Sequence, residues 1–276
     1  MPSPPGRLGE EDLPSTLSTL IDLHCHILPG TDDGPTTLDE SLALARVAVA
    51  AGTEVMVATP HVSWDFPGNS AAGIAEGVAR LRVALSGAGI PLELLTGGEI
   101  AMDRAVGLPD EELAALRLGG PKGTHLLVEC PFAPSAVGFA EVLGSLRSRG
   151  HEILLAHPER CPAFQRNPAA YEEFVAQGML GQVTAGALVG SFGRAVQTLG
   201  EHLVRNGLAH VVASDGHSAD RRRPSIRREL LQAGLQDRAD WLGRAVPAAI
   251  LSGRPLPPPP EEPDQRRSTR ARLFGR

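Results

Sequence analysis

The stretch LIDLHCHILPGTDDG, residues 20–34, decides the fold, because it joins a short apolar run to a dense group of polar side chains. The run 20–25 has the length and composition of a strand that is buried on both faces. Side chains alternate along a strand, so His24 and His26 share one face and Cys25 takes the other. The stretch therefore predicts a buried strand that ends in a pair of histidines, with two aspartates in the turn that follows.

Similar apolar runs recur along the chain and alternate with longer amphipathic segments. We expect further strands at 54–58, 92–95, 125–129, 152–156, 180–184 and 210–214. The segments between them predict helices at 37–51, 70–87, 135–149, 168–177, 191–206 and, with interruptions, 225–251. This alternation is typical of an α/β protein with parallel strands, either a barrel or a doubly wound sheet.

The first predicted helix has a clear beginning and end. Thr37 can cap its N-terminus, Glu40 can return the hydrogen bond, and Gly52 follows its last turn. The spacing of its apolar residues predicts a buried face made of Leu38, Leu42, Ala45 and Val49.

The composition excludes several classes of protein. A net charge of −6 gives no reason to expect a nucleic-acid partner, because such proteins carry basic patches for phosphates. No run approaches the roughly 20 apolar residues of a membrane helix, and the acidic N-terminus does not resemble a signal peptide. The 3 cysteines form no C-x-x-C pair, as expected in a reducing compartment. We therefore expect a cytoplasmic protein without a membrane span.

The two ends of the chain differ from its middle. Residues 1–18 are rich in proline, glycine and acidic residues, and residues 254–276 combine a proline run with arginines. Such segments cannot bury enough apolar surface to fold. We expect two disordered tails around one domain at 19–253.

Ionisable side chains occur where the predicted strands end. In a barrel of parallel strands the carboxyl ends converge on one face, so residues far apart in sequence meet there. Imidazole and carboxylate groups bind Zn, Mn or Fe, and a carboxylate can bridge two ions. A polynuclear metal site is the expected result, built from His24, His26, His61, Glu99, Glu129, His157, Asp215 and His217.

An alternative to the metal site is a cysteine-dependent enzyme with Cys25 as its nucleophile. A cysteine phosphatase needs a C-x5-R loop, and no cysteine of this chain has an arginine six residues later. Cys25 is also predicted to point away from the face of His24 and His26. We therefore expect it to be a packed core residue.

Taken together, these motifs resemble the polymerase and histidinol phosphatase (PHP) superfamily of metal-dependent phosphoesterases. The closer resemblance is to bacterial tyrosine-protein phosphatases of the CpsB/YwqE type, which act with capsule or exopolysaccharide loci. The resemblance covers roughly residues 20–235, and its blocks are IDLHCHILPGTDDG (21–34), VATPH (57–61), GGEI (97–100), LLVECPF (126–132), LLAHPER (154–160) and ASDGH (213–217). It implies a distorted seven-stranded (β/α) barrel, the PHP fold.

The resemblance also implies a ligand set for two or three divalent metals, manganese first, with iron, zinc or cobalt as alternatives. One metal would bind His24, His26, Glu99 and Asp215. A second would share Glu99 and bind Glu129 and His157, and a third would bind Asp33, His61 and His217. Asp33 is preferred over Asp32, which can serve as a supporting or turn residue.

Arginines with a substrate role follow from the same resemblance. Arg160 of HPER would bind the substrate phosphate, and either Arg222 or Arg223 would be a second clamp, with a preference for Arg222. Asp215 or His217 could relay a proton to the leaving group.

The implied function is hydrolysis of phosphotyrosine, with an autophosphorylated bacterial tyrosine kinase that controls polysaccharide export as the expected partner. Two alternatives within the enzymes are a small-molecule phosphatase, for example one acting on histidinol phosphate, and a nuclease. From another class, a noncatalytic metal-bound regulator that docks on a kinase is the alternative, although a complete ligand set argues against it.

Overall fold

The structure is a computed structural model of the chain and describes residues 19–260. The tails expected at 1–18 and 261–276 lie outside the described residues. Of the expected C-terminal tail, residues 254–260 are described, and the Trp241 indole Nε1 donates a hydrogen bond to the Pro257 carbonyl at 3.1 Å. In the described part of the chain, no helix is both long enough and apolar enough to cross a membrane.

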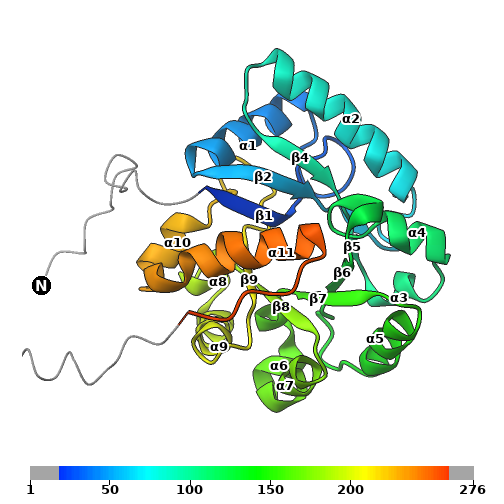
Figure 1. Cartoon of the computed structure of the whole chain (residues 1–276), viewed down its shortest axis with the longest axis vertical. Helices are drawn as coiled ribbons and strands as arrows, with labels where there is room; N and C mark the ends of the chain where they lie inside the picture. Colours follow the sequence, from blue (N-terminus) through cyan, green and yellow to red (C-terminus); the bar gives the residue numbers. More distant parts are fainter. Residues whose placement is uncertain (1–18, 261–276) are drawn as a thin grey trace, which may run out of the picture.

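The strands form two parallel sheets (Figure 1). One contains β1 (Leu20–Cys25), β2 (Thr53–Ala58) and β4 (Glu93–Thr96). The other has the order β3 (His61–Val62), β5 (Glu99–Ile100), β6 (His125–Glu129), β7 (Glu152–Ala156), β8 (Leu180–Thr184) and β9 (Val211–Ala213). The predicted α/β class with parallel strands is confirmed, whereas a closed barrel is not detected among the described residues.

Two predicted strands continue beyond an interruption. Pro60 lacks a backbone N–H, and it separates β2 from the two-residue β3. Gly97 and Gly98 separate β4 from β5, and a Cβ at either position would lie 2.8 Å from the side chain of Val57 or Leu116. The breaks move β3 and β5 into the second sheet, where they carry two of the predicted ligands.

Helices cover the outside of the sheets (Figure 1). The expected helices are found as α1 (Leu38–Ala50), α2 (Ala71–Gly87), α5 (Phe139–Ser148), α7 (Pro168–Ala176) and α9 (Arg194–Arg205). The last one is broken, as expected, into α10 (Arg227–Gln232), turns at 236–238 and 241–245, and α11 (Val246–Ser252). The sequence did not predict the short helices α3 (Met102–Ala105), α4 (Asp110–Ala115), α6 (Pro162–Arg166) and α8 (Ala185–Leu188).

The capping box predicted for α1 is present, with Thr37 accepting from the Glu40 N–H and Glu40 accepting from the Thr37 N–H. The predicted buried face is partly wrong. The buried residues are Ser41, Leu44, Ala45 and Ala48, and Leu38 is 45% exposed. The observed face is rotated from the predicted one and includes the polar Ser41, whose hydroxyl donates to the buried Ile27 carbonyl at 2.7 Å.

Main-chain hydrogen bonds join the end of β1 to the segment after β9. The Asp215 N–H donates to the His24 carbonyl at 2.8 Å, and the His26 N–H donates to the Gly216 carbonyl at 2.8 Å. Asp22 reinforces this junction, because its buried carboxylate accepts from the N–H and the hydroxyl of Ser214. The first and last strands of the chain thus lie side by side where the polar residues begin.

Candidate metal centre

The carboxyl ends of the strands bring the predicted ligands together. His24 lies on β1, His61 on β3, Glu99 on β5 and Glu129 on β6, while His157 follows β7. The register of β3 and β5 pairs His61 directly with Glu99. Within the described residues, four clusters have ligand atoms that lie within 4.8 Å of one another, and together they contain all nine predicted ligands: His24, His26, Asp33, His61, Glu99, Glu129, His157, Asp215 and His217.

Glu99 lies at the middle of the site. Its Oε1 is 2.7 Å from Nε2 of His157. Its Oε2 is 3.3 Å from Nε2 of both His24 and His26, and 3.1 Å from Nδ1 of His61. This carboxylate therefore contacts four imidazoles from three separate segments, as a bridging ligand would.

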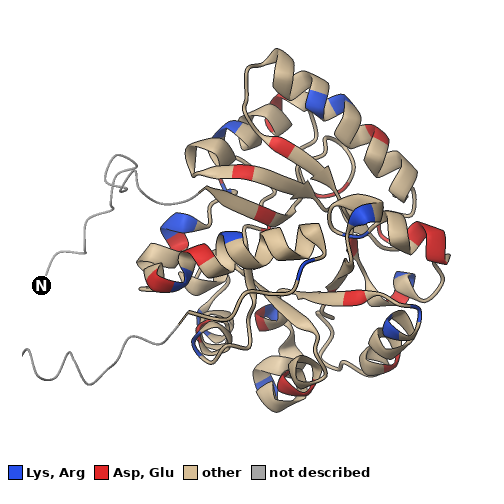
Figure 2. Cartoon of the chain, in the orientation of Figure 1, with Lys and Arg blue, Asp and Glu red and all other residues tan. Residues whose placement is uncertain are grey.

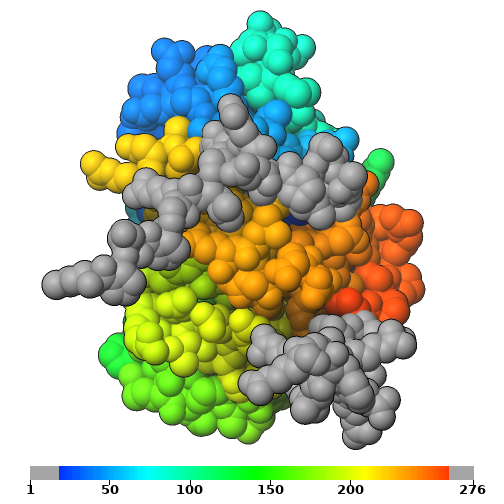
Figure 3. Space-filling view, turned by 90° about the vertical axis from the view of Figure 1, so that its left-hand side faces the viewer, coloured from blue at the N-terminus to red at the C-terminus, as the bar shows by residue number. Residues whose placement is uncertain are grey.

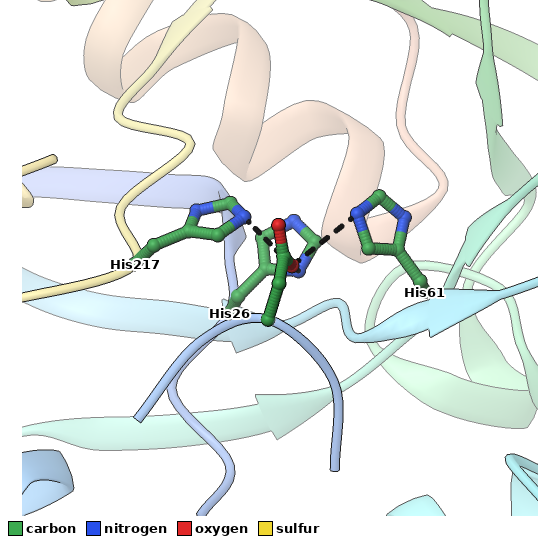
Figure 4. A group of neighbouring side chains, drawn as sticks. His26, His61 and His217 are labelled. Atoms are coloured by element: carbon green, nitrogen blue, oxygen red, sulfur yellow. Dashed lines mark ion pairs between the residues drawn. The ribbon is translucent and has the colours of Figure 1, made fainter. Parts of the chain in front are cut away.

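A second group surrounds Asp33, which is half-exposed at the edge of the site. Its Oδ1 is 3.2 Å from Nε2 of His217 and 3.5 Å from Nε2 of His61, the ion pairs that are dashed in Figure 4. The rings of His26, His61 and His217 come from three different segments and face a common centre (Figure 4). Each of the three offers a ring nitrogen to this centre, as the ligands of one metal would.

A third group is fully buried. His24 and His26 approach each other at 3.2 Å between their Nε2 atoms. Each of these nitrogens is also 3.6 Å from Oδ1 of Asp215. His26 belongs to this group and to the Asp33 group, so the clusters overlap more than the sequence assignment of one metal per set implied.

Supporting hydrogen bonds fix the orientation of three imidazoles. His24 donates from Nδ1 to the Gln182 amide oxygen at 2.9 Å, and His26 donates from Nδ1 to Asp32 at 2.6 Å. His217 donates from Nδ1 to the Asp215 carbonyl at 3.0 Å. In each ring the other nitrogen is directed toward the centre, which is how proteins orient metal-binding histidines.

Two of the ligand positions have an unusual backbone. Within residues 19–260, His157 (φ 34°) and Asp215 (φ 51°) are the residues other than glycine with a positive φ. Such left-handed conformations cost free energy and concentrate at functional sites.

The electrostatics of the site are dominated by burial and by carboxylate–imidazole pairs. Burial disfavours the His26 imidazolium, but the hydrogen bond to Asp32 and the nearby Glu99 outweigh it and raise the pKa of His26 to about 10. Burial also opposes ionisation of Glu99, yet His24 and the hydrogen bond from His157 hold the pKa of Glu99 well below its usual range. Burial lowers the pKa of His157 to about 4, so this imidazole is neutral and can act as a ligand at neutral pH.

The raised pKa of Glu129 and two buried atoms without a hydrogen bond indicate that a cation fits here. Burial and the nearby Glu99 raise the pKa of Glu129 to about 8, because two buried carboxylates repel each other without a cation between them. Glu99 Oε2 and His217 Nε2 are buried, and the imidazole or carboxylate atoms 3.1–3.3 Å from them are not aligned for a hydrogen bond. Buried polar atoms are normally satisfied, and a bound divalent ion would satisfy these.

Arginines and aromatic rings surround the buried carboxylate of Asp215. Arg160 and Arg222 both donate to its Oδ2, at 2.7 and 2.5 Å. The Arg160 guanidinium also lies 4.8 Å from the ring centres of both Phe132 and Phe192. The two positively charged groups therefore lie at the mouth of the cluster, where they can meet an anion.

A cavity of about 580 Å³ opens beside this mouth. Its lining comes from α1, the turn before it, and the segment after β9, and includes Asp33, Glu40, His217, Arg221 and Arg222. Figure 3 shows the yellow residues after β9 next to the blue residues of the N-terminal third. Positions of both charge signs are distributed over the helices in Figure 2.

Some residues of the site were missed from the sequence. Gln182 is a buried polar residue in an apolar strand, the same signal that singled out Glu129, and it supports His24. Phe132 and Phe192 gave no signal, because aromatic residues in loops have no periodic pattern. Cys25 is fully buried in the apolar core, and burial raises the pKa of its thiol well above the usual range, as expected for packing and not for a nucleophile.

Comparison with known proteins gives a consistent result. Residues 20–234 match the family described as capsular polysaccharide synthesis, CpsB/CapC. The tyrosine-protein phosphatase YwqE of Bacillus subtilis is 35% identical over 204 residues, which are 74% of this chain and 79% of that protein. The tyrosine-protein phosphatase CpsB of Streptococcus pneumoniae is 26% identical over 212 residues, covering 74% of this chain and 86% of that protein.

Solved structures extend the likeness to three dimensions. One solved structure belongs to a set that describes YwqE from Bacillus subtilis and CpsB from Streptococcus pneumoniae as metal-dependent tyrosine phosphatases. It aligns with a TM-score of 0.75 at 28% identity, and the alignment covers 88% of this chain and 100% of that chain. A β-aspartyl dipeptidase of Fervidobacterium islandicum AW-1 aligns with a TM-score of 0.54 at 18% identity, over 85% of this chain and 72% of that chain. The second likeness shows the fold alone.

Proposed function

Because the chain belongs to the CpsB/CapC family of capsular polysaccharide synthesis, we propose that it is a metal-dependent tyrosine-protein phosphatase that hydrolyses phosphotyrosine. The observation that carries the proposal is the convergence of nine histidine, aspartate and glutamate side chains on one site, with two arginines at its mouth. This donor set suits divalent metals, and the arginines suit a phosphate.

The proposed ligands fall into overlapping sets. His24, His26, Glu99 and Asp215 would hold one metal, and Glu99 with Glu129 and His157 a second. Asp33, His61 and His217 would hold a third. Manganese is the metal we expect first, since carboxylate and imidazole ligands suit it, with iron, zinc or cobalt as alternatives. The ions would supply a water of lowered pKa and a clamp for the phosphoryl oxygens.

The remaining chemistry belongs to the residues of the chain. Arg160 and Arg222 would bind the nonbridging oxygens of the substrate phosphate and neutralise the charge that develops during transfer. Arg222 is favoured over Arg223 for the second clamp because its guanidinium reaches Asp215 at 2.5 Å. Asp215 or His217 would pass a proton to the leaving phenolate, since both lie beside the arginines or on the cavity. Buried Cys25 takes no part, so no covalent phosphoenzyme is required.

The fold that we propose for residues 19–253 is the distorted seven-stranded (β/α) barrel. Three observations support it: β2 with β3 and β4 with β5 act as two interrupted strands, main-chain bonds join β1 to the end of β9, and one apolar cluster contains side chains from β1, β2, β6, β7, β8 and β9. Alternate side chains from all around a barrel would meet in such a cluster.

The partner that we propose is a bacterial tyrosine kinase of capsule or exopolysaccharide synthesis, encountered in the cytoplasm as an autophosphorylated substrate. The family description and the tyrosine phosphatase relatives support this choice. The partner would therefore be a phosphorylated protein, and not a nucleic acid.

A comparison of three substrates tests the proposed function. Purified protein, with its metal content measured, is assayed on a phosphotyrosine peptide, histidinol phosphate and a short oligonucleotide with added Mn²⁺. We expect the peptide to react fastest. A faster reaction with histidinol phosphate or the oligonucleotide would replace the proposal by the corresponding enzyme, and no reaction with any of them would favour a noncatalytic regulator.

A matched pair of histidine variants tests the role of the metal cluster. His157→Ala removes a buried partner of Glu99 and is expected to abolish most p-nitrophenyl phosphate turnover. His202→Ala changes a partly exposed histidine on α9 and should leave turnover unchanged. Equal activity of the two variants at full metal content would remove His157 from the proposed ligand set.

A further inference from the structure

Phe132 lies at the mouth of the metal centre and has no role in the chemistry described so far. It follows β6 by three residues, and its ring stacks on His157 with centroids 5.4 Å apart and planes 22° from parallel. The Arg160 guanidinium lies 4.8 Å from the same ring. One aromatic side chain therefore contacts both a proposed metal ligand and the proposed phosphate-binding arginine.

Much of the Phe132 ring remains open despite these contacts. The residue is 47% exposed, while His157 beneath it is buried. The ring of Phe192 lies at the same distance, 4.8 Å, from the Arg160 guanidinium. The exposed part of Phe132 thus borders the place where a phosphate bound by Arg160 would carry its organic group.

The geometry points to Phe132 as the residue that selects an aromatic phosphate ester, by packing its exposed face against the ring of phosphotyrosine. In phosphotyrosine the ring is joined to phosphorus through a single oxygen, so a phosphate held by Arg160 brings the ring close to Phe132. An alkyl ester such as phosphoserine has no ring to place there. Phe66 stacks on His61, but within residues 19–260 the phenylalanine rings that lie beneath an arginine are those of Phe132 and Phe192.

The inference rests on the proposed phosphatase activity and adds a source of specificity to it. A contact between two aromatic rings is worth about 0.5–1.5 kcal/mol beyond the area that it buries, which corresponds to a change of about 2- to 13-fold. We therefore expect Phe132 to set a preference of this size between aromatic and alkyl esters. Phe132 should have a smaller effect on how the phosphate group binds, because Arg160 keeps its ion pair with Asp215 and its contact with Phe192 without it.

The test compares two peptides of identical sequence that carry phosphotyrosine or phosphoserine, hydrolysed by the full chain loaded with Mn²⁺. In Phe132→Leu and Phe132→Ala, the ratio of the two kcat/KM values should fall about fivefold, mainly through KM for the phosphotyrosine peptide. Phe132→Trp should retain the ratio. Val137→Ala, which alters an 85% exposed residue of the same connection, is the control that should match the wild type.

The results that would contradict the role of Phe132 can be distinguished from those that would contradict the phosphatase proposal. If Phe132 only supports Arg160 and His157, the substitutions lower both rates together and the ratio stays constant, which overturns the inference and leaves the phosphatase proposal intact. A wild type that shows no preference between the peptides overturns it as well. If the metal-loaded wild type hydrolyses neither peptide, the proposed function itself has failed.

Discussion

Replacement of Arg160 by methionine separates the charge of this residue from its packing. Methionine keeps an unbranched apolar chain between Phe132 and Phe192 but removes the guanidinium that contacts Asp215 at 2.7 Å. A charge about 4 Å from a phosphoryl group contributes about 4 kcal/mol at an effective dielectric constant of about 20. The Arg160 side chain is only 18% exposed, so solvent screens little of this. We expect kcat/KM on a phosphotyrosine peptide to fall about 1000-fold.

The neighbouring arginines give the internal comparison. Arg222 is more exposed, at 31%, so Arg222→Met should cost about 10- to 100-fold. Arg223→Met should change kcat/KM less than threefold. Steady-state kinetics at saturating Mn²⁺, with the metal content of each variant measured, decides the outcome. A fully metal-loaded Arg160→Met enzyme within fivefold of the wild type would refute the reasoning, and a larger loss in Arg223→Met than in Arg222→Met would reverse the choice between these two.

Three further predictions concern the support of the site and the core. Gln182→Leu removes the amide oxygen that accepts from His24, so Mn²⁺ binding, measured in competition with a chelator, should weaken about 10- to 100-fold. Gln182→Glu keeps an acceptor and serves as the control. Equal Mn²⁺ affinities of the two variants would argue against an orienting role for Gln182. Burial lowers the pKa of His210 to about 4, against about 6.5 when unfolded, so the unfolded chain binds the additional proton in that window. This residue alone should therefore lower the free energy of unfolding by about 3 kcal/mol between pH 6.5 and 4. His210→Asn, which can still accept from the Gly181 N–H, should remove that part of the pH dependence in urea unfolding, and an unchanged slope contradicts the assignment. Cys25→Ala should retain kcat and lose about 1 kcal/mol of stability, while loss of all turnover would restore the cysteine as a nucleophile.

The strands and the ligand candidates could be predicted because their signals are local. A short apolar run that ends in a histidine or carboxylate is visible in a few residues, and parallel topology then implies that such ends meet. The short strands that follow the breaks at Pro60 and at Gly97–Gly98 could not be predicted, because two-residue strands such as β3 have no sequence pattern of their own. The buried face of α1 was not predicted correctly because it includes a serine, and the hydrogen bond that satisfies Ser41 goes to a distant carbonyl that the apolar pattern does not reveal.

Supporting contacts were harder to predict than ligands for a related reason. Gln182 is 158 positions from His24, and Asp32 serves His26 and the His61 N–H together through a turn whose geometry only the fold defines. Phe132 and Phe192 are part of the site because both rings contact the guanidinium of Arg160, which belongs to a third segment. Pairwise contacts between loops are set by the arrangement of the strands, so they follow from the fold and not from any stretch of sequence.

The backbone at His157 and Asp215 gives an argument for function that is independent of resemblance. A left-handed conformation costs a residue other than glycine about 1–3 kcal/mol, and glycine would remove most of that cost. The chain nevertheless has His157 at φ 34° directly after β7, with its imidazole turned onto Glu99 at 2.7 Å. A buried histidine at such a backbone position, beside a buried carboxylate, is expected where its chemistry outweighs its cost to stability, and this supports the proposal of His157 as a metal ligand.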